Sequence, residues 1–530
     1  LNEINNTFEV KSVVLFQGIT GSGKTEVYLE LIAQAIAKGK QVLYLLPEIS
    51  LTPQIVQRLQ ARFGSEVTAY HSKFNVHERT EVWNNILENN PNAKIIVGTR
   101  SALFLPFHQL GLVIVDEEHE LSYKQSDPSP RYHARDSAVV LAGMHKAKVI
   151  LGSATPALES SFNRLSGKYG WVQLVERYGK VALPEIHTID LKSAYKKKEM
   201  KGGFSQTLIK EMGQTLTMGK QIILFQNQRG YAPIMDCMDC GHMPECHQCD
   251  VTLTYHQYSD QLKCHYCGYQ IAVPEKCHAC GLANLSTKGM GTQQIQEQVA
   301  TLFPDAKVAR MDWDTTRGKW AFDKLIHSFA AQEVNILVGT QMIIKGLDFQ
   351  NVHLVGVLNA DHLMNFPDFR AYERTYQMLS QVAGRAGRKA LRGKVLIQTY
   401  QPHHPIIQQV IDGNYDQMLN HQLKDRKEYH YPPFNRLIRM VVNHSDMETV
   451  KKASQWIVNV LLQSDYAQIL GPVFPPIARV RNRYRMQILV KIEGFQSRNR
   501  VKKLIRKTLD RFESIAIFRS CRVNLDVDPY

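Results

Sequence analysis

Short apolar runs alternate with stretches of helical periodicity from Val13 to about Pro156. Each run ends in small or polar residues, which is typical of buried parallel strands whose carboxyl ends carry functional side chains. The runs are VVLFQG, QVLYLLPE, KIIVGTR, LVIVDEEH and VILGSATP. The pattern predicts a nucleotide-binding lobe built on a parallel sheet within residues 1–165.

A second series of the same kind follows, with the runs QIILFQNQRG, VARMDWD, NILVGTQ, VHLVGVLNAD and KVLIQTY. Two such lobes in tandem predict an α/β fold with a cleft between the lobes. We expect residues 166–235 to form the connector and the start of the second lobe, and residues 286–420 to complete it. A cysteine-rich segment, residues 236–285, is inserted after the first strand of that lobe.

The pattern changes after about His421. It predicts strand, helix, strand, strand, helix and strand from RLIRMVV, ETVKKASQWIVNVLLQS, ILGPVF, YRMQILVKI, SRNRVKKLIRKTLDRF and CRVNLDV. This is the order of a split βαβ arrangement, so residues 421–530 are predicted to form a separate α+β domain.

Positive charge gathers at this end of the chain. The 530 residues have a formal net charge of +15, and residues 421–530 carry 21 Lys and Arg against 10 Asp and Glu, a local net charge of +11. Such an excess favours a polyanionic partner, although a merely solvated surface would have the same composition.

No apolar run approaches the roughly 20 residues that cross a bilayer, and the first residues are not typical of a secretion signal. We therefore expect a cytoplasmic protein without membrane contact. The chain begins with Leu1 rather than Met, and only seventeen residues precede the first glycine-rich loop. This start indicates a fragment or a processed chain, so upstream domains are expected to be missing.

Eight of the nine cysteines form four Cys-x-x-Cys pairs: Cys237/Cys240, Cys246/Cys249, Cys264/Cys267 and Cys277/Cys280. In a reducing compartment, thiolates at this spacing are zinc ligands, and disulfides are the alternative. Eight ligands suit two Zn²⁺ ions. Pair by pair, the spacing permits three ways of sharing the ligands between the two ions.

The stretch Gly18-Ile19-Thr20-Gly21-Ser22-Gly23-Lys24-Thr25 meets the phosphate-loop pattern, between an apolar run and a helical stretch. Backbone N–H groups of such a loop cradle the phosphates of ATP. Lys24 is expected to reach the outer phosphates, and the Thr25 hydroxyl to bind Mg²⁺. A chance glycine-rich turn is the alternative.

Asp116, Glu117, Glu118 and His119 follow an apolar run and are predicted to lie beside the phosphate loop. A carboxylate there can hold Mg²⁺, and the next can orient or deprotonate the attacking water. We therefore expect Asp116 to be the metal residue and Glu117 the general base. Glu118 is open to a simpler role, the capping of the next helix.

QVAGRAGR supplies Gln381, Arg385 and Arg388 in a helical spacing that is predicted to face the first lobe. Guanidinium groups that arrive when the cleft closes stabilise the charge developing on the transferred phosphate. An exposed basic turn is the alternative.

ARVRNRYRMQ places Arg479, Arg481, Arg483 and Arg485 at alternate positions. On one strand they would share a face, and such a row can follow a phosphate backbone. A solvated edge that discourages strand pairing is the alternative.

Together the motifs resemble the ordered motifs of superfamily 2 helicases: GITGSGKTE, LLPEISLTPQ, GTRSALF, DEEH, GSATP, ILFQNQRGYAP, VGTQMIIKGLDF and QVAGRAGR. Four further features are similar to one family among them, the bacterial primosomal protein N′ (PriA) family of replication-restart helicases. They are SYKQSDPSPRYHARD after DEEH, the cysteines after NQRGYAP, YPPF, and the terminal LDVDP. The resemblance covers essentially the whole chain.

This resemblance implies a 3′-to-5′ DNA helicase that uses ATP with Mg²⁺, binds stalled or repaired forks, and starts reloading of the replicative helicase. The implied partners are forked and single-stranded DNA, single-stranded DNA-binding protein, and other primosome components including the replicative helicase and its loader. We expect the chain to be a monomer.

In that family an aromatic-rich loop after the Asp-Glu-Glu-His box links DNA contact to hydrolysis, and the matching residues are Tyr123, Lys124, Arg131, Tyr132, His133 and Arg135. Interleaved rings and cations suit a single strand, and a polar loop with two core-packing tyrosines is the alternative. The resemblance also assigns Cys246, Cys249, Cys264 and Cys267 to one zinc ion and the outer two pairs to the other.

Family members carry an upstream DNA-binding region with a winged-helix domain, and a glutamine motif that holds adenine. Neither is identifiable in this chain, so we expect fork-end specificity and adenine recognition to lie upstream of Leu1. Two alternatives stay open: a DNA translocase that does not separate strands, and a zinc-bearing scaffold for which ATP is a switch. A scaffold needs neither a general base nor an arginine finger, which favours the enzymes.

Overall fold

The computed structural model describes residues 1–47, 53–71, 74–180, 182–226, 234–237, 242–247, 251–256, 260–264, 269–283, 285–288, 291–312, 315–316, 321–343, 349–366, 368–387 and 392–529. The chain divides into two units. The first holds residues 1–227 and 295–423, and the second holds residues 228–294 and 424–530.

Seven parallel strands form the sheet of the first lobe, in the order β3-β4-β2-β5-β6-β1-β7. The strands are β1 (Val13–Gly18), β2 (Gln41–Leu45), β3 (Val67–Tyr70), β4 (Ile95–Gly98), β5 (Leu110–Asp116), β6 (Lys148–Ser153) and β7 (Gly170–Leu174). The five strands expected from the apolar runs are confirmed, and their parallel pairing brings the functional carboxyl ends to one edge.

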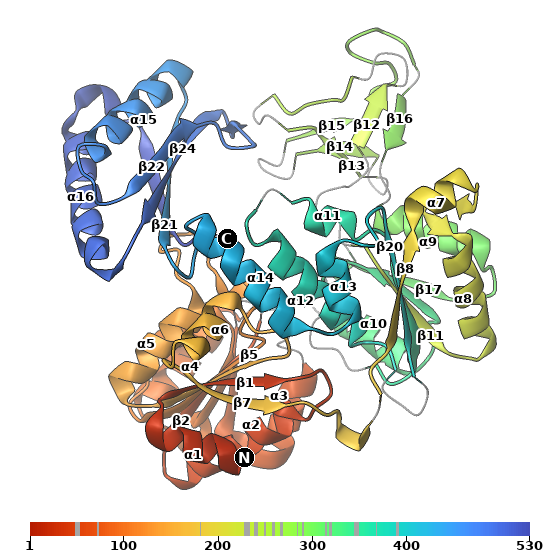
Figure 1. Cartoon of the computed structure of the whole chain (residues 1–530), viewed down its shortest axis with the longest axis horizontal. Helices are drawn as coiled ribbons and strands as arrows, with labels where there is room; N and C mark the ends of the chain where they lie inside the picture. Colours follow the sequence, from red (N-terminus) through yellow and green to blue (C-terminus); the bar gives the residue numbers. More distant parts are fainter. Residues whose placement is uncertain are drawn as a thin grey trace. The chain divides into compact units, whose positions relative to one another are not determined.

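Helices cover both faces of this sheet because alternate strand residues point to opposite sides. One face packs against α1 (Asn2–Val10), α2 (Lys24–Ala37) and α3 (Pro53–Phe63), and the other against α4 (Val76–Leu87) and α5 (Ala134–His145), as Figure 1 shows. Short 3₁₀ turns complete the lobe: η1 (Gly64–Glu66), η2 (Pro91–Ala93), η3 (Arg100–Phe104) and η4 (Leu121–Tyr123).

The second lobe has a six-stranded parallel sheet in the order β17-β18-β11-β19-β20-β8. The strands are β8 (Glu185–Asp190), β11 (Gln221–Phe225), β17 (Val308–Met311), β18 (Ile336–Gly339), β19 (Val352–Val357) and β20 (Lys394–Thr399). A hairpin of β9 (Met200–Lys201) and β10 (Phe204–Ser205) lies outside this sheet. The two predicted tandem lobes are thus confirmed.

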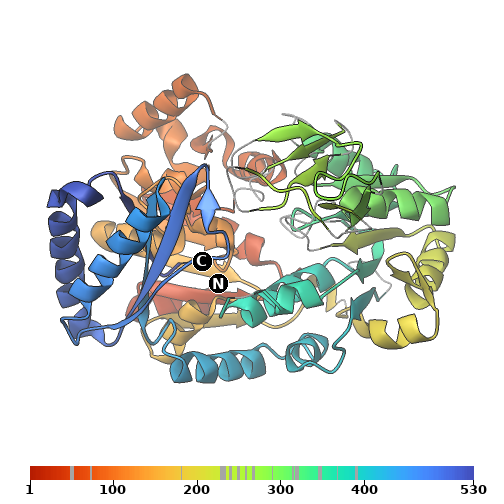
Figure 2. The same cartoon turned by 90° about the horizontal axis from the view of Figure 1, so that it is seen from above.

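The main core of the second lobe lies between its sheet and five helices: α10 (Ala321–Ala330), α11 (Asp361–Met364), α12 (Ala371–Ala383), α13 (Pro405–Ile411) and α14 (Tyr415–Glu428). Figure 2 shows α8 (Gln206–Thr217) on the side of the sheet away from α12. The remaining helices are α7 (Leu191–Lys196) and α9 (Thr292–Leu302).

The connector between the lobes contributes a strand to each sheet. β7 pairs with β1 at the edge of the first sheet, and β8 pairs with β20 at the edge of the second. The 3₁₀ turn η5 (Tyr178–Lys180) lies between them. The connector is therefore anchored in both lobes.

One short helix of the first lobe also packs into the second. α6 is Leu158–Leu165, and its first residue, Leu158, is fully buried in the core cluster that otherwise consists of second-lobe residues. Burial of a leucine side chain is worth about 1.5–3 kcal/mol, so this residue contributes to the stability of the contact between the lobes.

The cysteine-rich segment forms an antiparallel sheet in the order β15-β14-β13-β12-β16. The strands are β12 (Ile234–Cys237), β13 (Thr254–His256), β14 (Gln261–Lys263), β15 (Gln270–Ala272) and β16 (Leu285–Lys288). Its small core includes Cys246 and Cys264 with Leu253 and Leu262. Buried cysteines in a small antiparallel sheet suit a fold that metal ions stabilise.

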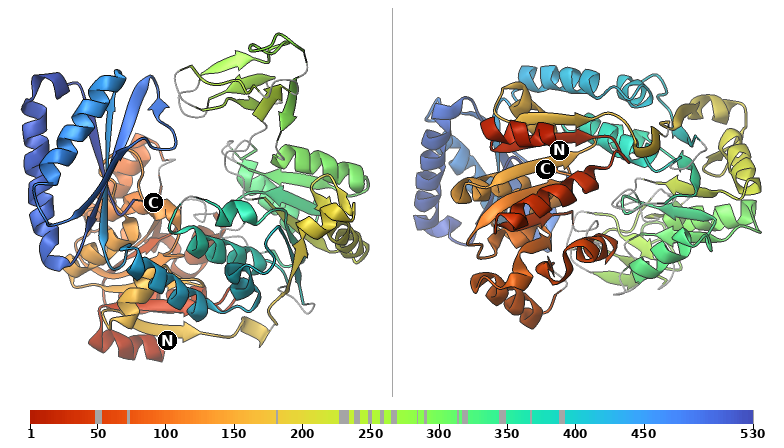
Figure 3. Two further views of the ribbon diagram at one scale, coloured as in Figure 1. Left: turned by 45° about the horizontal axis from the view of Figure 1, so that its top comes forward. Right: turned by 90° about the horizontal axis from the view of Figure 1, so that it is seen from below.

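The last domain has the predicted strand, helix, strand, strand, helix, strand order, except that a further two-residue strand, Arg479–Val480, precedes the third predicted strand. Its elements are β21 (Arg436–His444), α15 (Met447–Leu461), β22 (Gln468–Val473), β23 (Arg479–Val480), β24 (Arg483–Ile492), α16 (Phe495–Ser514), η7 (Ala516–Phe518) and β25 (Arg522–Val527). The antiparallel sheet runs β22-β24-β21-β25, with β23 paired to β24. Figure 3 shows α15 and α16 on one face of this sheet, over the core.

No helix within the described ranges is both long enough and apolar enough to cross a membrane.

The buried position of Leu158 generates a stability prediction. We expect Leu158→Ala to lower the free energy of unfolding by about 2–5 kcal/mol, because it removes a fully buried side chain and leaves a cavity. Leu165→Ala, in the last turn of the same helix, is the matched control because Leu165 is 55 % exposed. Urea unfolding followed by circular dichroism measures both, and equal effects of the two substitutions would contradict the packing described.

Candidate functional site

The phosphate-loop motif connects β1 to α2. Gly23 is the N-cap of α2 and has a φ of +87°, a conformation that side chains with a Cβ rarely adopt. A Cβ on Gly18 would lie 2.7 Å from Ser22 Oγ and 2.8 Å from Lys24 Cγ. Lys24 Nζ donates to the carbonyl oxygen of Gly18 at 2.7 Å, so its ammonium group lies over the loop.

This loop fits a phosphate group. Ser22 Oγ is buried and has no hydrogen-bond partner in the described part of the chain, whereas buried hydroxyl groups are usually hydrogen-bonded. The first amides of α2 lack intrahelical partners and carry the positive end of the helix dipole. Lys24 and Thr25 are the first two residues of that helix. An anion bound here would therefore meet side-chain hydroxyl groups, backbone amides and the Lys24 ammonium group.

Asp116 ends β5 and is held by two tyrosines that no motif predicts. The Tyr28 hydroxyl donates to Asp116 Oδ1 at 3.0 Å, and the Tyr44 hydroxyl donates to Oδ2 at 3.5 Å. Burial, together with the negative charge of Glu117, raises the pKa of Asp116 to about 6. A carboxylate whose pKa is raised by desolvation is stabilised in its charged form by a nearby cation, so Asp116 fits the predicted Mg²⁺ ligand.

Glu117 adopts a strained backbone conformation. Its φ is +48°, which is uncommon for a residue with a side chain. Its N–H donates to Asp116 Oδ1 at 3.0 Å, and its own side chain keeps 29 % of its surface exposed. The turn therefore directs two adjacent, partly buried carboxylates differently: that of Asp116 toward Tyr28 and Tyr44, and that of Glu117 toward the second lobe.

The second lobe reaches this turn through α12. Gln381 Nε2 lies 2.7 Å from His119 Nε2 and donates to Glu117 Oε2 at 3.4 Å. On its other side, His119 Nδ1 lies 2.7 Å from Ser153 Oγ, in the segment GSATP. Three motifs that are far apart in sequence thus meet at one buried histidine.

Gly384 brings the same helix end against the phosphate loop. A Cβ on Gly384 would lie 2.8 Å from Thr20 Oγ1, so only glycine allows this approach. Arg385 does not continue the helix from Gln381 as the spacing predicts, because α12 ends at Ala383 and Gly384 is its C-cap. Arg385 follows the end of the helix and is partly buried. Arg388 lies outside the described residues.

Glu118 is a buried structural residue. Its carboxylate accepts from the Ala157 N–H at 2.7 Å, from Ser160 Oγ at 2.8 Å and from Arg135 Nη1 at 3.1 Å. Ala157 is the N-cap of α6, so Glu118 does cap a helix, although that helix is not the next one along the chain.

The aromatic-rich loop only partly matches its predicted role. Tyr123, Lys124 and Arg135 have buried side chains, so the expectation that all three contact DNA directly does not fit their burial. The Tyr123 hydroxyl donates to the carbonyl oxygens of Asp116 and Leu45 at 2.7 and 3.0 Å, and Lys124 Nζ donates to that of Arg131 at 2.9 Å. The Tyr123 contacts attach the loop to β2 and β5, and the Lys124 contact lies within the loop.

Arg131, Tyr132 and His133 are partly exposed. The Tyr132 ring packs edge-on against Phe104, with 5.0 Å between the ring centroids, and Phe104 is 57 % exposed. Phe104 belongs to GTRSALF, and its position beside the loop was not predicted. A ring pair that is at least partly exposed is suited to stack nucleic-acid bases.

The arginine row of the last domain is divided between two strands, so the predicted single strand is wrong. Arg481 and Asn482 both have positive φ, at 51° and 56°, and form the two-residue turn of a hairpin between β23 and β24. Arg479 pairs with Tyr484 and therefore shares its face, opposite to that of Arg483 and Arg485. Two arginines, rather than four, share the sheet face that points away from the helices.

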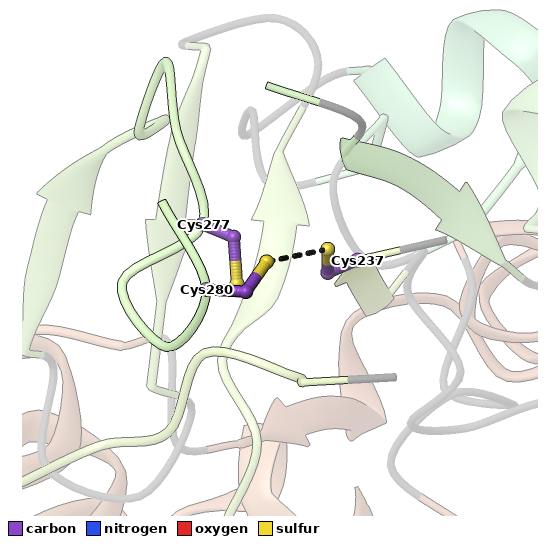
Figure 4. Close-up of side chains that lie close together, drawn as sticks. All are labelled: Cys237, Cys277 and Cys280. Atoms are coloured by element: carbon purple, nitrogen blue, oxygen red, sulfur yellow. Dashed lines mark hydrogen bonds between the residues drawn. The ribbon is translucent and has the colours of Figure 1, made fainter. Parts of the chain in front are cut away.

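Three of the four cysteines assigned to one zinc site lie together. Ligand atoms of Cys237, Cys277 and Cys280 are within 4.8 Å of one another, and Cys237 Sγ is 3.6 Å from Cys280 Sγ (Figure 4). Cys240, the fourth, lies outside the described residues. Three convergent thiols fit a tetrahedral zinc ion that has one further ligand.

The first cysteine of each of the four Cys-x-x-Cys pairs makes an equivalent backbone hydrogen bond. The N–H of the first cysteine donates to the carbonyl five residues later: Cys237 to His242, Cys246 to Val251, Cys264 to Tyr269 and Cys277 to Leu282, at 2.9, 2.9, 2.7 and 2.8 Å. Cys249 and Cys267 lie outside the described residues. The inner pairs therefore share this hydrogen bond with the outer pairs, among which the three thiols converge.

Four family models match the chain. They are the DEAD/DEAH box helicase model at residues 2–162, the helicase conserved C-terminal domain at 290–390, the PriA DNA helicase Cys-rich region domain at 246–271, and the primosomal protein N C-terminal domain at 427–530.

Relatives named replication restart protein PriA match nearly the whole chain. The Bacillus subtilis protein is 41 % identical over 98 % of this chain and 64 % of its own length, and the Haemophilus influenzae protein is 40 % identical over 98 % and 70 %. The Rickettsia felis protein is 38 % identical over 100 % and 79 %. The chain spans less than two thirds of the Bacillus relative.

The raised pKa of Asp116 predicts how Mg²⁺-dependent nucleotide binding changes with pH. Below about pH 6 the carboxyl is increasingly protonated, so a proton must leave before Mg²⁺ binds, and the Mg²⁺ requirement should rise up to about tenfold per pH unit. Binding of fluorescent ADP at varied Mg²⁺ between about pH 8 and pH 5 measures this. ADP binding in EDTA is the control for other titrating groups, and an unchanged Mg²⁺ requirement would contradict the assignment.

Proposed function

This chain belongs to the PriA family of replication restart proteins, and from that premise we propose that it is an ATP-dependent DNA helicase. It acts at stalled or repaired replication forks, moves 3′ to 5′, and initiates reloading of the replicative helicase. The observation that carries the proposal is the contact of Gln381 with His119 and Glu117. It connects the second lobe to the turn at Asp116–His119, here called the hydrolytic turn.

ATP binds at the phosphate loop, residues 18–25. The loop N–H groups and Lys24 hold the phosphates, and the Thr25 hydroxyl with Asp116 holds Mg²⁺. Bound with ATP, Mg²⁺ supplies positive charge beside the phosphate oxygens. Tyr28 and Tyr44 keep the Asp116 carboxylate in one orientation.

Glu117 orients and deprotonates the attacking water, since its side chain keeps 29 % of its surface exposed and is not held by the two tyrosines that bind Asp116. Gln381 positions Glu117 from the second lobe, and Arg385 and Arg388 stabilise the charge that develops on the transferred phosphate. Hydrolysis then requires both lobes, which couples it to their relative motion.

DNA contacts the first lobe through Arg131, Tyr132 and His133 together with the ring of Phe104. The hydrogen bonds from Tyr123 to the Asp116 and Leu45 carbonyls connect this surface to the hydrolytic turn. Arg483 and Arg485, with Arg481 at the adjacent turn, contact the phosphate backbone from the last domain. Single-stranded DNA-binding protein, the replicative helicase and its loader are the protein partners that the family implies.

The first experiment is ATP hydrolysis with single-stranded DNA, forked duplex and single-stranded RNA, with displacement of a labelled strand followed in parallel. We expect DNA to stimulate hydrolysis and the strand to be released from a duplex with a 3′ tail. Stimulation without release would favour a translocase. No response to any nucleic acid would contradict the proposal for this chain and favour the scaffold.

Substitutions in the same assay test the assigned roles. Glu117→Gln should lower kcat by about 10²–10⁴-fold, because it removes the general base. Lys24→Ala should abolish turnover while DNA binding persists. Lys38→Ala, an exposed lysine after the same helix, is the matched control and should behave like the wild type. Equal loss of DNA binding and turnover in Lys24→Ala would contradict its role at the phosphates.

We further propose two Zn²⁺ ions, one held by Cys237, Cys240, Cys277 and Cys280 and one by Cys246, Cys249, Cys264 and Cys267. Cys237→Ser and Cys264→Ser should each lower the zinc content by about one equivalent, measured by atomic emission on the purified chain. Cys521→Ser changes the ninth cysteine, in the last domain, and should retain both equivalents. A single zinc ion in the unsubstituted chain would contradict the assignment.

A further inference from the structure

The connector after β7 follows the phosphate loop closely. The Ile19 N–H donates to the Leu174 carbonyl at 3.2 Å, and the Tyr178 N–H donates to the Gly21 carbonyl at 2.9 Å. Residues 174–178 are thus attached to the loop at both ends. None of the helicase motifs includes this segment.

Arg177 lies inside that attachment and is buried, with 7 % of its surface exposed. Its Cγ and Cδ lie 3.9 and 4.0 Å from the point where a Cβ of Gly21 would be, which is ordinary packing against the phosphate loop. Its Nη1 donates to the carbonyl of Gly387 at 2.8 Å, in the QVAGRAGR segment of the second lobe. One side chain therefore contacts the nucleotide loop of the first lobe and the motif that closes over it.

Gly387 is held firmly at the other end of this contact. Its N–H donates to the Val352 carbonyl at 3.0 Å, and its φ is +65°. A Cβ at this position would lie 2.3 Å from the backbone nitrogen of Gly393. Because Gly387 is fixed to β19 in this way, a hydrogen bond to its carbonyl attaches Arg177 to the body of the second lobe.

We propose that Arg177 is a positioning residue that ties the phosphate loop to the QVAGRAGR segment and so links nucleotide binding to closure of the lobes. This inference rests on the proposed ATP hydrolysis. The guanidinium group suits the task because its stem packs on Gly21 while its planar head donates to a carbonyl beyond. Its positive charge also lies close to where the phosphates of a nucleotide would bind.

This tie predicts that loss of Arg177 changes the affinities for ADP and for ATP analogues by different amounts. ADP needs mainly the phosphate loop, whereas ATP and its analogue AMP-PNP also engage the second lobe through the third phosphate. Loss of Arg177 should therefore leave ADP affinity close to that of the wild type and weaken AMP-PNP binding. Because closure also assembles the hydrolytic groups, kcat should fall about tenfold to hundredfold.

The test uses Arg177→Met, which keeps the apolar stem and removes the guanidinium group. Fluorescent ADP and AMP-PNP affinities are measured with and without single-stranded DNA, together with kcat and KM for ATP. In the wild type we expect DNA to strengthen AMP-PNP binding by a factor of about 5–150, as is typical of coupled sites. In Arg177→Met this factor should approach one.

Tyr178→Ala is the matched control. The Tyr178 side chain is 88 % exposed, and its backbone N–H to Gly21 survives the substitution, so coupling should stay unchanged. Arg177→Lys keeps the charge and can still donate one hydrogen bond to the Gly387 carbonyl, so we expect coupling in it between that of Arg177→Met and that of the wild type. Melting temperatures of all variants separate loss of coupling from loss of folding.

Wild-type coupling in Arg177→Met, or equal weakening of ADP and AMP-PNP binding, would overturn the inference. If the unsubstituted chain binds both nucleotides without hydrolysing ATP, the proposed function fails separately. The difference between ADP and AMP-PNP affinities in Arg177→Met still tests the tether in that case, since it requires no turnover.

Discussion

The lack of a side chain at Gly384 allows the two lobes to meet at the nucleotide loop. Even one added carbon would lie 2.8 Å from Thr20 Oγ1, so a larger residue would hold α12 away from the loop. The other contacts depend on this approach. It brings Gln381 within 2.7 Å of His119, and it places Gly387 where Arg177 reaches its carbonyl. A local steric constraint thus sets the geometry of a site assembled from both lobes.

Much of the fold is predictable from sequence because buried parallel strands are continuous apolar runs. The strands β7 and β8 could not be predicted from apolar runs, and the cause is physical. Each is an edge strand with one neighbour, so part of its surface stays exposed and its apolar pattern is weak. Their positions are decided by pairing with β1 and β20, which is a tertiary property. The last domain was predictable because its strands alternate between a buried and an open face.

The candidate site is predictable where a motif dictates backbone conformation, as at Gly18 and Gly23, and less so where tertiary contacts decide. Tyr28 and Tyr44 look like core residues in sequence, and only the fold brings both hydroxyls to Asp116. The reverse holds for Tyr123 and Arg135, which resemble ligand-binding residues but form buried internal bonds. The arginine row fails because alternation indicates a shared face only within one strand, and Arg481 with Asn482 turns the chain.

The start of α6 shows why the hydrolytic turn and the second lobe cannot move independently. Its first free amides are taken by two carboxylates of different origin: Ala157 N–H donates to Glu118 at 2.7 Å, and Leu158 N–H donates to Glu373 of α12 at 2.8 Å. Separating the lobes would break the second bond, while the first holds the helix to the turn beside Glu117. A buried carboxylate that loses its partner has to be resolvated, and Leu158 would leave its apolar cluster at the same time. Separation of the two lobes therefore costs free energy mainly at the start of α6. A conformational change in the turn at Asp116–His119 would alter the contacts at that same helix end.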